Sequence, residues 1–250
     1  MPAEPDPTLR LLWRHVLGAE DEGPKRGRRP KVSVDEVVDA AIELADRDGL
    51  EALSMRPLAE HLGIGAMTLY SYVASRDDLV VLMVDQVYGR EPIEPMTGDL
   101  RARLTLVADA ALAIHRAHPW LLDVVGVRPW LGPHVADRYE WQLSAIEGVG
   151  LDDIEMDQTI TLVAGFAANV ARAEHAVRRA ERQSGMTDLE WWEANADELG
   201  RVMAGRDYPL AGRVGSATGE AYQAGTDPRR ELEFGLARIL DGIESHLRQR

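Results

Sequence analysis

Cysteine is absent from this 250-residue chain, and aromatic side chains make up only 6% of it. Without cysteine the chain forms no disulfide, carries out no thiolate chemistry and builds no Cys-type zinc site, so a metal would need histidine and carboxylate ligands. No window reaches the roughly 18 uninterrupted apolar residues of a membrane span, and the N-terminal segment MPAEPDPTLR lacks the pattern of a secretory signal. We therefore expect a cytoplasmic protein without a membrane partner.

Positive charge is also scarce, because 28 Lys and Arg residues stand against 42 Asp and Glu residues, for a formal net charge of -14. Five of the basic residues lie in the segment KRGRRPK (25–31), which leaves -14 minus 5, or -19, on the rest of the chain. An acidic total argues against nucleic acid, but binding depends on the charge within about one Debye length, roughly 8–10 Å. The basic segment is therefore either a DNA contact or only a solvated tail.

The hydrophobic content of 45% is enough for a buried core, and helical patterns dominate the chain. Apolar residues at helical spacing over 9–17 predict a short docking helix, and Gly and Pro make the following segment, up to Pro30, a linker. Ser33 and Glu36 form the S-x-x-E capping box, and Gly49 supplies a C-terminal stop, so a helix is predicted over 34–48.

Two short helices and a tight turn follow. The first is expected to begin after Ser54 and to end at Gly63, and the turn 63–65 separates it from the segment AMTLYSYV. A second capping box, formed by Ser75 and Asp78, opens the next helix. Two short helices joined by a three-residue turn that contains Gly are typical of a helix-turn-helix, whose second helix lies in the major groove of DNA.

Small and polar side chains are predicted on the outer face of that second helix. Leu69 and Val73 are four residues apart and should face the core. The outer face would then carry Ala66, Met67, Thr68, Ser71 and Tyr72. Thr suits base edges and Tyr hydroxyls suit phosphates. A packed aromatic helix is the alternative, but the basic segment just upstream and the order of the elements favour DNA.

The stretch from Arg29 to Asp85 resembles the TetR family of bacterial transcriptional repressors, with LSMRPLAEHLG, MTLYSYV and SRDDLV similar to that family's second, third and fourth helices. HRAHPWLLDVV and FGLARILDGIE are similar to the C-terminal domain of the tetracycline-repressor subgroup. The resemblance implies an all-α homodimer with an N-terminal helix-turn-helix domain and a larger C-terminal ligand-binding and dimerisation domain. The implied divisions are an extension with the basic arm (1–30), the DNA-binding domain (31–85) and the C-terminal domain (86–250).

The resemblance also assigns roles to individual residues. Arg56 matches an arginine that reaches a guanine, Thr68 a base contact, Tyr70 and Tyr72 phosphate contacts, and Arg76 a lysine that holds a phosphate. The basic arm would enter the adjacent minor groove. Ala66 and Met67 differ from the polar or Pro residues of the tetracycline repressor, so we expect an operator whose sequence differs from that repressor's. The predicted DNA contacts are therefore Arg28, Arg29, Lys31, Arg56, Ala66, Met67, Thr68, Tyr70, Ser71, Tyr72 and Arg76.

In the C-terminal half, patterns predict helices over 100–117, 135–147 and 157–182 and a final amphipathic helix from 229. Between the last two, DLEWWE begins a helix, after which Gly and Pro loosen the chain. The 157–182 helix is apolar on several sides, which indicates a buried or interface position. The resemblance implies that it forms a four-helix dimer interface with the final helix, and an ordinary monomer core is the alternative.

A ligand pocket among helices should be mostly apolar with a few polar groups. The candidates are His115, Trp120, Trp141, Phe166, Asn169, Arg172, His175 and Trp191. His115 and His118 are spaced to share a metal, but H-E-x-x-H and a third ligand are lacking, so we expect no metal and no cofactor.

Taken with the resemblance, the sequence predicts a repressor that binds a palindromic DNA operator and is released by a small-molecule inducer. Alternatives are a DNA-binding architectural or activating protein without an inducer, and an all-helical enzyme. The sequence shows no nucleophile–base pair, and Gly63-x-Gly65 lacks the third glycine of a phosphate loop. We therefore expect no enzyme.

Overall fold

The computed structural model describes residues 7–17, 32–124 and 131–249, and every regular element in these ranges is a helix. None of the described helices is long and apolar enough to span a membrane. The elements in chain order are α1 (Thr8–Leu12), α2 (Arg14–Leu17), α3 (Val34–Asp48), η1 (Leu50–Ala52), α4 (Met55–His61), α5 (Ala66–Tyr72), α6 (Arg76–Arg90), α7 (Leu100–Ala117), η2 (Pro119–Asp123), α8 (Pro133–Ser144), α9 (Asp153–Ser184), α10 (Asp188–Val202), α11 (Pro209–Tyr222) and α12 (Pro228–Arg248).

The helix predicted over 34–48 is confirmed as α3, with its capping box. Ser33 Oγ accepts a hydrogen bond from Glu36 N at 3.1 Å, and Glu36 Oε2 accepts one from Ser33 N at 2.6 Å. Gly49 ends the helix at φ 87°, a backbone conformation that favours glycine. Helix α4 begins after Ser54 as predicted, although the Ser54 side chain makes no cap hydrogen bond.

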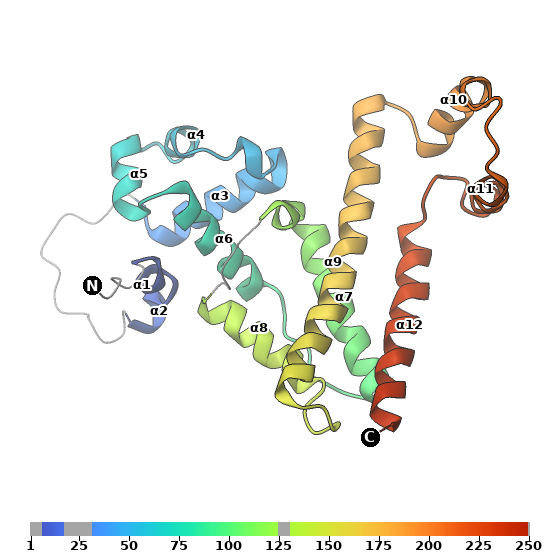
Figure 1. The fold of residues 1–250 in the computed structure, drawn as a ribbon. Helices are drawn as coiled ribbons and strands as arrows, with labels where there is room; N and C mark the ends of the chain where they lie inside the picture. The colour runs from blue at the N-terminus through green and yellow to red at the C-terminus, as the bar shows by residue number, and fades with distance from the viewer. Residues whose placement is uncertain (1–6, 18–31, 125–130, 250) are drawn as a thin grey trace, which may run out of the picture.

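The helices α3 to α6 enclose one apolar core at the left of Figure 1, with the N-terminal helices packed beside it. Its fully buried members include Val37, Leu58, Leu69, Val73 and Leu82. A short helix such as α5 is not stable alone in water, so packing of its apolar side chains on this core holds it in place.

The N-terminal docking helix is broken into two pieces. Trp13 lies between α1 and α2, Leu12 is buried in the first core, and Val16 and Leu17 are exposed. The predicted docking helix is therefore interrupted at Trp13, and its C-terminal end, with Val16 and Leu17, is exposed.

The C-terminal helices form a second apolar core. Helices α7 and α12 both pack against α9 and also contact each other, and the three long helices stand together at the right of Figure 1. Leu104, Val107, Val163 and Ala167 are fully buried between them. Helix α8 contacts both α6 and α9 and thereby connects the two cores.

Two of the predicted boundaries and one predicted loop differ from the structure. Helix α8 covers 133–144 instead of 135–147, and α9 covers 153–184 instead of 157–182, because Pro133 and the Asp152 capping box start them earlier. Residues 209–222, expected to be loosened by Gly and Pro, form α11, because proline is favourable in a first helical turn. Neither α10 nor α11 contains a buried residue.

The junction between α6 and α8 is tightly packed around two glycines. A Cβ on Gly132 would lie 2.1 Å from Asp85 Oδ1, and a Cβ on Gly89 would lie 2.6 Å from the His134 ring. Asp85 is only 4% exposed. The approach of the two helices therefore requires glycine at both positions, for reasons of space and not of backbone angle.

We expect Gly132→Ala to lower the free energy of unfolding by about 1–3 kcal/mol, because the new methyl group displaces the Asp85 carboxylate. Urea unfolding followed by circular dichroism measures this change. Gly200→Ala, in an exposed helix with nothing within 4 Å of the added carbon, is the matched control and should stabilise by up to about 1 kcal/mol. Equal stability of the two variants would contradict the role given to Gly132.

Candidate nucleic-acid interface and ligand site

Helix α5 presents one exposed face while its other face is locked into the core. Leu69 and Val73 are fully buried, whereas Met67 is 83% exposed and Tyr70 is 45% exposed. Thr68 and Ser71 are also exposed. Because the anchoring residues lie on the opposite side, α5 can enter a groove without losing its own packing.

Two of the predicted contact residues on α5 are less accessible. Ala66 and Tyr72 are half-buried and pack against the first core, so the prediction that Tyr72 stands fully on the outside is wrong. The hydroxyl of Ser71 already donates to Thr68 O at 2.6 Å, which leaves its oxygen free to accept. Met67, Thr68 and Tyr70 thus form the most open part of the face.

Arg56 lies in the first turn of α4 and extends into solvent. Its side chain is 87% exposed, and its Nε lies 3.5 Å from Glu60 Oε1, one turn along the helix. Exposed pairs of this kind contribute little because water screens them. The guanidinium is therefore available for a contact with DNA.

Arg76 has a different set of partners from those predicted. Its Nε donates to Leu53 O at 2.8 Å and its Nη2 donates to Leu50 O at 2.6 Å, so the guanidinium ties the start of α6 to the turn before α4. Its contact with a phosphate stays a prediction. What the structure adds is a positioning role that the sequence did not indicate, since the Leu50 and Leu53 carbonyls lie in a distant stretch of the chain.

The basic arm residues Arg28, Arg29 and Lys31 lie outside the described residues. Their predicted contact with the minor groove therefore stays a prediction.

Four of the predicted ligand-site residues lie where α7, η2 and α9 meet. Trp120 is 2% exposed, His115 Nδ1 lies 2.6 Å from Ala111 O, and Arg172 Nη1 donates to Leu122 O at 2.8 Å. Burial lowers the pKa of His115, and the nearby charge of Arg172 lowers it further. Burial and the charge of Arg182 likewise lower the pKa of His175, so both rings favour the neutral state.

A cavity of about 630 Å³ lies between the C-terminal end of α3 and the basic half of α9. Trp120 and His175 contribute to its lining. The cavity wall formed by α3 and η1 carries the carboxylates of Asp48 and Glu51, and the wall formed by α9 carries arginines. The volume is in the range of small-molecule sites.

The sequence prediction missed two lining residues, Arg179 and Arg182. They share one face of α9 with His175 at helical spacing, which was the available signal. Within the described residues neither guanidinium makes a hydrogen bond or an ion pair. Both charges are therefore available to a bound anionic group.

Of the eight predicted ligand residues only Trp120 and His175 line this cavity; His115 and Arg172 lie near it without lining it, and the other four lie elsewhere. Trp141 donates from Nε1 to Glu94 O at 2.7 Å. Phe166 packs against Gly235 of α12, and Asn169 is exposed. Trp191 lies on α10, edge-on to Trp192 with ring centroids 5.5 Å apart. These four candidates are separated from the cavity because they face different neighbours of α9 or stand on the separate helix α10.

His115 and His118 do not act as a pair. His118 Nδ1 lies 2.8 Å from Asp46 Oδ1 of α3, and the same oxygen accepts from Trp120 Nε1 at 2.8 Å. These bonds connect η2 to the end of α3. No group of three His, Asp or Glu suited to a metal ion is present in the part of the chain that the structure describes.

Family comparisons match both regions of the chain. Residues 37–83 match the profile of the bacterial regulatory proteins of the tetR family, and residues 91–247 match the tetracyclin repressor-like C-terminal domain. The chain is 40% identical over 247 residues to the HTH-type transcriptional repressor DrrR1 of Streptomyces coeruleorubidus. The alignment covers 97% of this chain and 87% of that protein. It is 31% identical over 202 residues to an HTH-type transcriptional regulator of Saccharopolyspora erythraea, covering 80% and 81% of the two chains.

Solved structures show the same arrangement of helices. Apo ActR of Streptomyces coelicolor aligns with a TM-score of 0.68 at 24% identity, over 89% of this chain and 99% of ActR. The complex of ActR with actinorhodin aligns with a TM-score of 0.63 at 25% identity, over 86% and 98%. The complex with (S)-DNPA gives 0.64 at 25% identity, over 86% and 98%.

We expect Arg56→Ala to weaken binding to the preferred DNA site by about 1–3 kcal/mol and to relax the preference at one base pair, because a bidentate contact to guanine is lost. Tyr70→Phe should instead weaken binding to all sequences alike. Fluorescence anisotropy with the site and its single-base variants measures both. Glu60→Gln, which removes only the partner of Arg56, is the control. An unchanged preference at every base would contradict the role of Arg56.

Arg76→Ala is expected to lower the free energy of unfolding by about 1.5–3 kcal/mol, because charge-assisted hydrogen bonds to two carbonyls are lost. Arg76→Lys keeps the positive charge but cannot span both carbonyls, so it should be destabilised as well. Urea unfolding measures both variants. Full stability of Arg76→Lys would show that charge alone matters at this position.

Proposed function

The chain belongs to the TetR family and is a DNA-binding transcriptional repressor, and from this premise we propose that it binds a palindromic operator as a homodimer and leaves it when a small molecule binds. The observation that carries the proposal is the exposed face of α5, with Met67, Thr68 and Tyr70 open and Leu69 and Val73 buried behind them. Arg56 at the start of α4 extends the same surface.

A second subunit would cover the outer faces of α9 and α12. Leu162 of α9 is 51% exposed and Phe234 of α12 is 68% exposed. Between the two helices runs a groove of about 470 Å³, with Leu162, Ile239 and Ile243 among its lining residues. Paired with the same two helices of a partner, this surface would form a four-helix interface.

The small-molecule response is proposed by analogy with ActR, whose solved complexes hold actinorhodin and (S)-DNPA. In the present chain the cavity beside Trp120 and His175 is the proposed site, because it separates the end of α3 from α9. A ligand there changes how the DNA-binding helices sit on the C-terminal helices. It shifts the population away from operator by no more than its differential affinity for the two states.

Selection of bound duplexes from a random pool is expected to enrich a palindrome whose half-sites lie about 10–10.5 base pairs apart or a multiple of this, because the two α5 helices enter successive major grooves on one face. The affinity for the selected duplex should fall steeply as the salt concentration rises, because contacts with phosphates release counterions. Light scattering with and without the duplex measures the stoichiometry. Enrichment of a single half-site, bound by a monomer, would overturn the dimer.

Titration of the operator complex with actinorhodin and with (S)-DNPA tests the response, and release of the duplex is expected with at least one of them. A double variant, Arg179→Gln with Arg182→Gln, should keep operator affinity in the absence of ligand but need a higher ligand concentration, because two cationic partners are lost from the cavity. Arg201→Gln on α10, paired with Glu198, is the control. Release unchanged in the double variant would place the ligand elsewhere.

A further inference from the structure

We infer that residues 8–17 form a strap which, with Asp85, clamps the N-terminal end of α8 and so sets the orientation of the DNA-binding helices relative to the C-terminal helices. The strap precedes the stretch matched by the DNA-binding family profile, which begins at residue 37. The inference rests on the operator binding proposed above, because its consequence is measured on the operator.

The strap is docked on the helix that follows the recognition helix. Leu12 is buried at 3% exposure and joins the first core. Thr8 is buried as well, and its hydroxyl donates to Asp78 Oδ1 at 2.6 Å. Asp78 belongs to the first turn of α6, where its backbone N–H donates to the capping Ser75 at 3.1 Å. The strap therefore contacts α6 close to the point where α5 ends.

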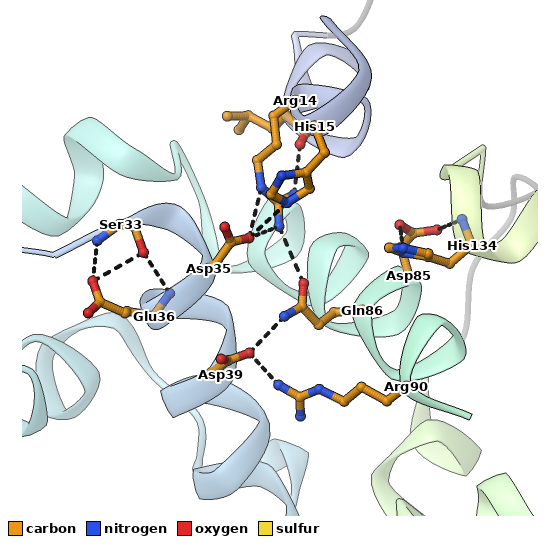
Figure 2. Close-up of polar contacts among 11 residues, drawn as sticks. Arg14, His15, Ser33, Asp35, Glu36, Asp39, Asp85, Gln86, Arg90 and His134 are labelled. Atoms are coloured by element: carbon orange, nitrogen blue, oxygen red, sulfur yellow. Dashed lines mark hydrogen bonds and ion pairs between the residues drawn. The ribbon is translucent and has the colours of Figure 1, made fainter. Parts of the chain in front are cut away.

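Polar contacts continue from the strap across α3 and α6 (Figure 2). Arg14 Nε donates to Asp35 Oδ1 at 3.1 Å, and Arg14 Nη2 donates to Gln86 Oε1 at 3.3 Å. Gln86 Nε2 in turn donates to Asp39 Oδ1 at 2.7 Å, and Arg90 pairs with the same oxygen. One connected network of hydrogen bonds thus joins the strap, α3 and α6. A shift of any one of these three segments would break hydrogen bonds to the other two.

The same strap reaches the other part of the molecule. Trp13 Nε1 donates to Leu131 O at 2.9 Å, just before α8 begins. From the opposite direction, Asp85 Oδ1 accepts from His134 N and Val135 N, both at 3.0 Å, and Asp85 Oδ2 lies 2.9 Å from His134 Nδ1. Figure 2 shows the Asp85 carboxylate facing His134. Two backbone N–H groups at a helix start are among the strongest partners that a buried carboxylate finds.

The N-terminal end of α8 is therefore held at two points, by Trp13 and by Asp85. Since α8 also packs against α9, the clamp is a direct mechanical connection between the second core and α6. Helix α6 begins at Arg76, three residues after the buried Val73 that caps the C-terminal end of α5. Its orientation thus determines where α5 is presented, and neither Trp13 nor Asp85 needs to touch DNA itself.

The test compares four proteins: the full chain, Trp13→Phe, a deletion of residues 1–17, and the control Trp192→Phe. Trp13→Phe keeps an aromatic ring but removes the N–H donor, and the deletion keeps the whole basic segment from Lys25 to Lys31. Each is measured for affinity to the selected operator, for affinity to a random duplex over a salt series, and for urea unfolding.

We expect Trp13→Phe to lower operator affinity about two- to tenfold, the range that corresponds to one hydrogen bond, and the deletion to lower it more than tenfold. Affinity for the random duplex and its salt slope should stay unchanged in both, because the clamp touches no phosphate. Trp192→Phe, on the exposed face of α10, should match the full chain in all three measurements.

Two results would overturn the clamp. The first is equal operator affinity in the full chain and in the deletion. The second is a parallel loss of operator affinity, random-duplex affinity and stability, which would make the strap only a stabilising element. A full chain that selects no operator at all would instead be a failure of the proposed function, and the two failures are thereby told apart.

Discussion

The buried carboxylate of Asp85 determines how the two halves of this molecule fit together. An isolated charge in an apolar interior is costly, and Asp85 is tolerated because two backbone N–H groups at the start of α8 and the His134 ring surround it. That arrangement in turn requires Gly132, since any side chain there would occupy the position of the carboxylate. The position of α8 on α6 is thus fixed. Because the C-terminal helices pack on α8, their position relative to α6 is fixed with it.

The DNA-binding surface depends on this chain of contacts more than on its own helices. A seven-residue helix such as α5 has little stability of its own, so Leu69 and Val73 must hold it on the core. Arg76 ties the next helix to the turn before α4 and so keeps Arg56 and α5 in a constant relation. The residues predicted to face DNA are few and exposed, while the residues that place them are buried.

Charge is distributed to match these roles. The chain carries a net charge of -14, yet five basic residues lie in the segment 25–31, Arg56 stands at the start of α4, and Arg179 and Arg182 lie on one face of α9. Local fields decide binding at distances of about one Debye length, so an acidic protein presents both a surface for DNA and a basic cavity wall. Carboxylates of α3 and η1 face that wall across the cavity, where the two cores approach each other.

The sequence by itself determined the all-helical class, the helix-turn-helix, the capped starts of α3 and α6 and the burial of Leu69 and Val73, because caps, turns and helical periodicity act within a few residues. Only the tertiary structure decided that Tyr72 packs inward, that Arg76 binds carbonyls, that the eight candidate ligand residues divide among separate neighbourhoods and that α11 is a helix. It alone brought Trp13 to Leu131 and Asp85 to His134. Such contacts join residues far apart in the chain, and no local pattern encodes which distant surface a side chain will meet.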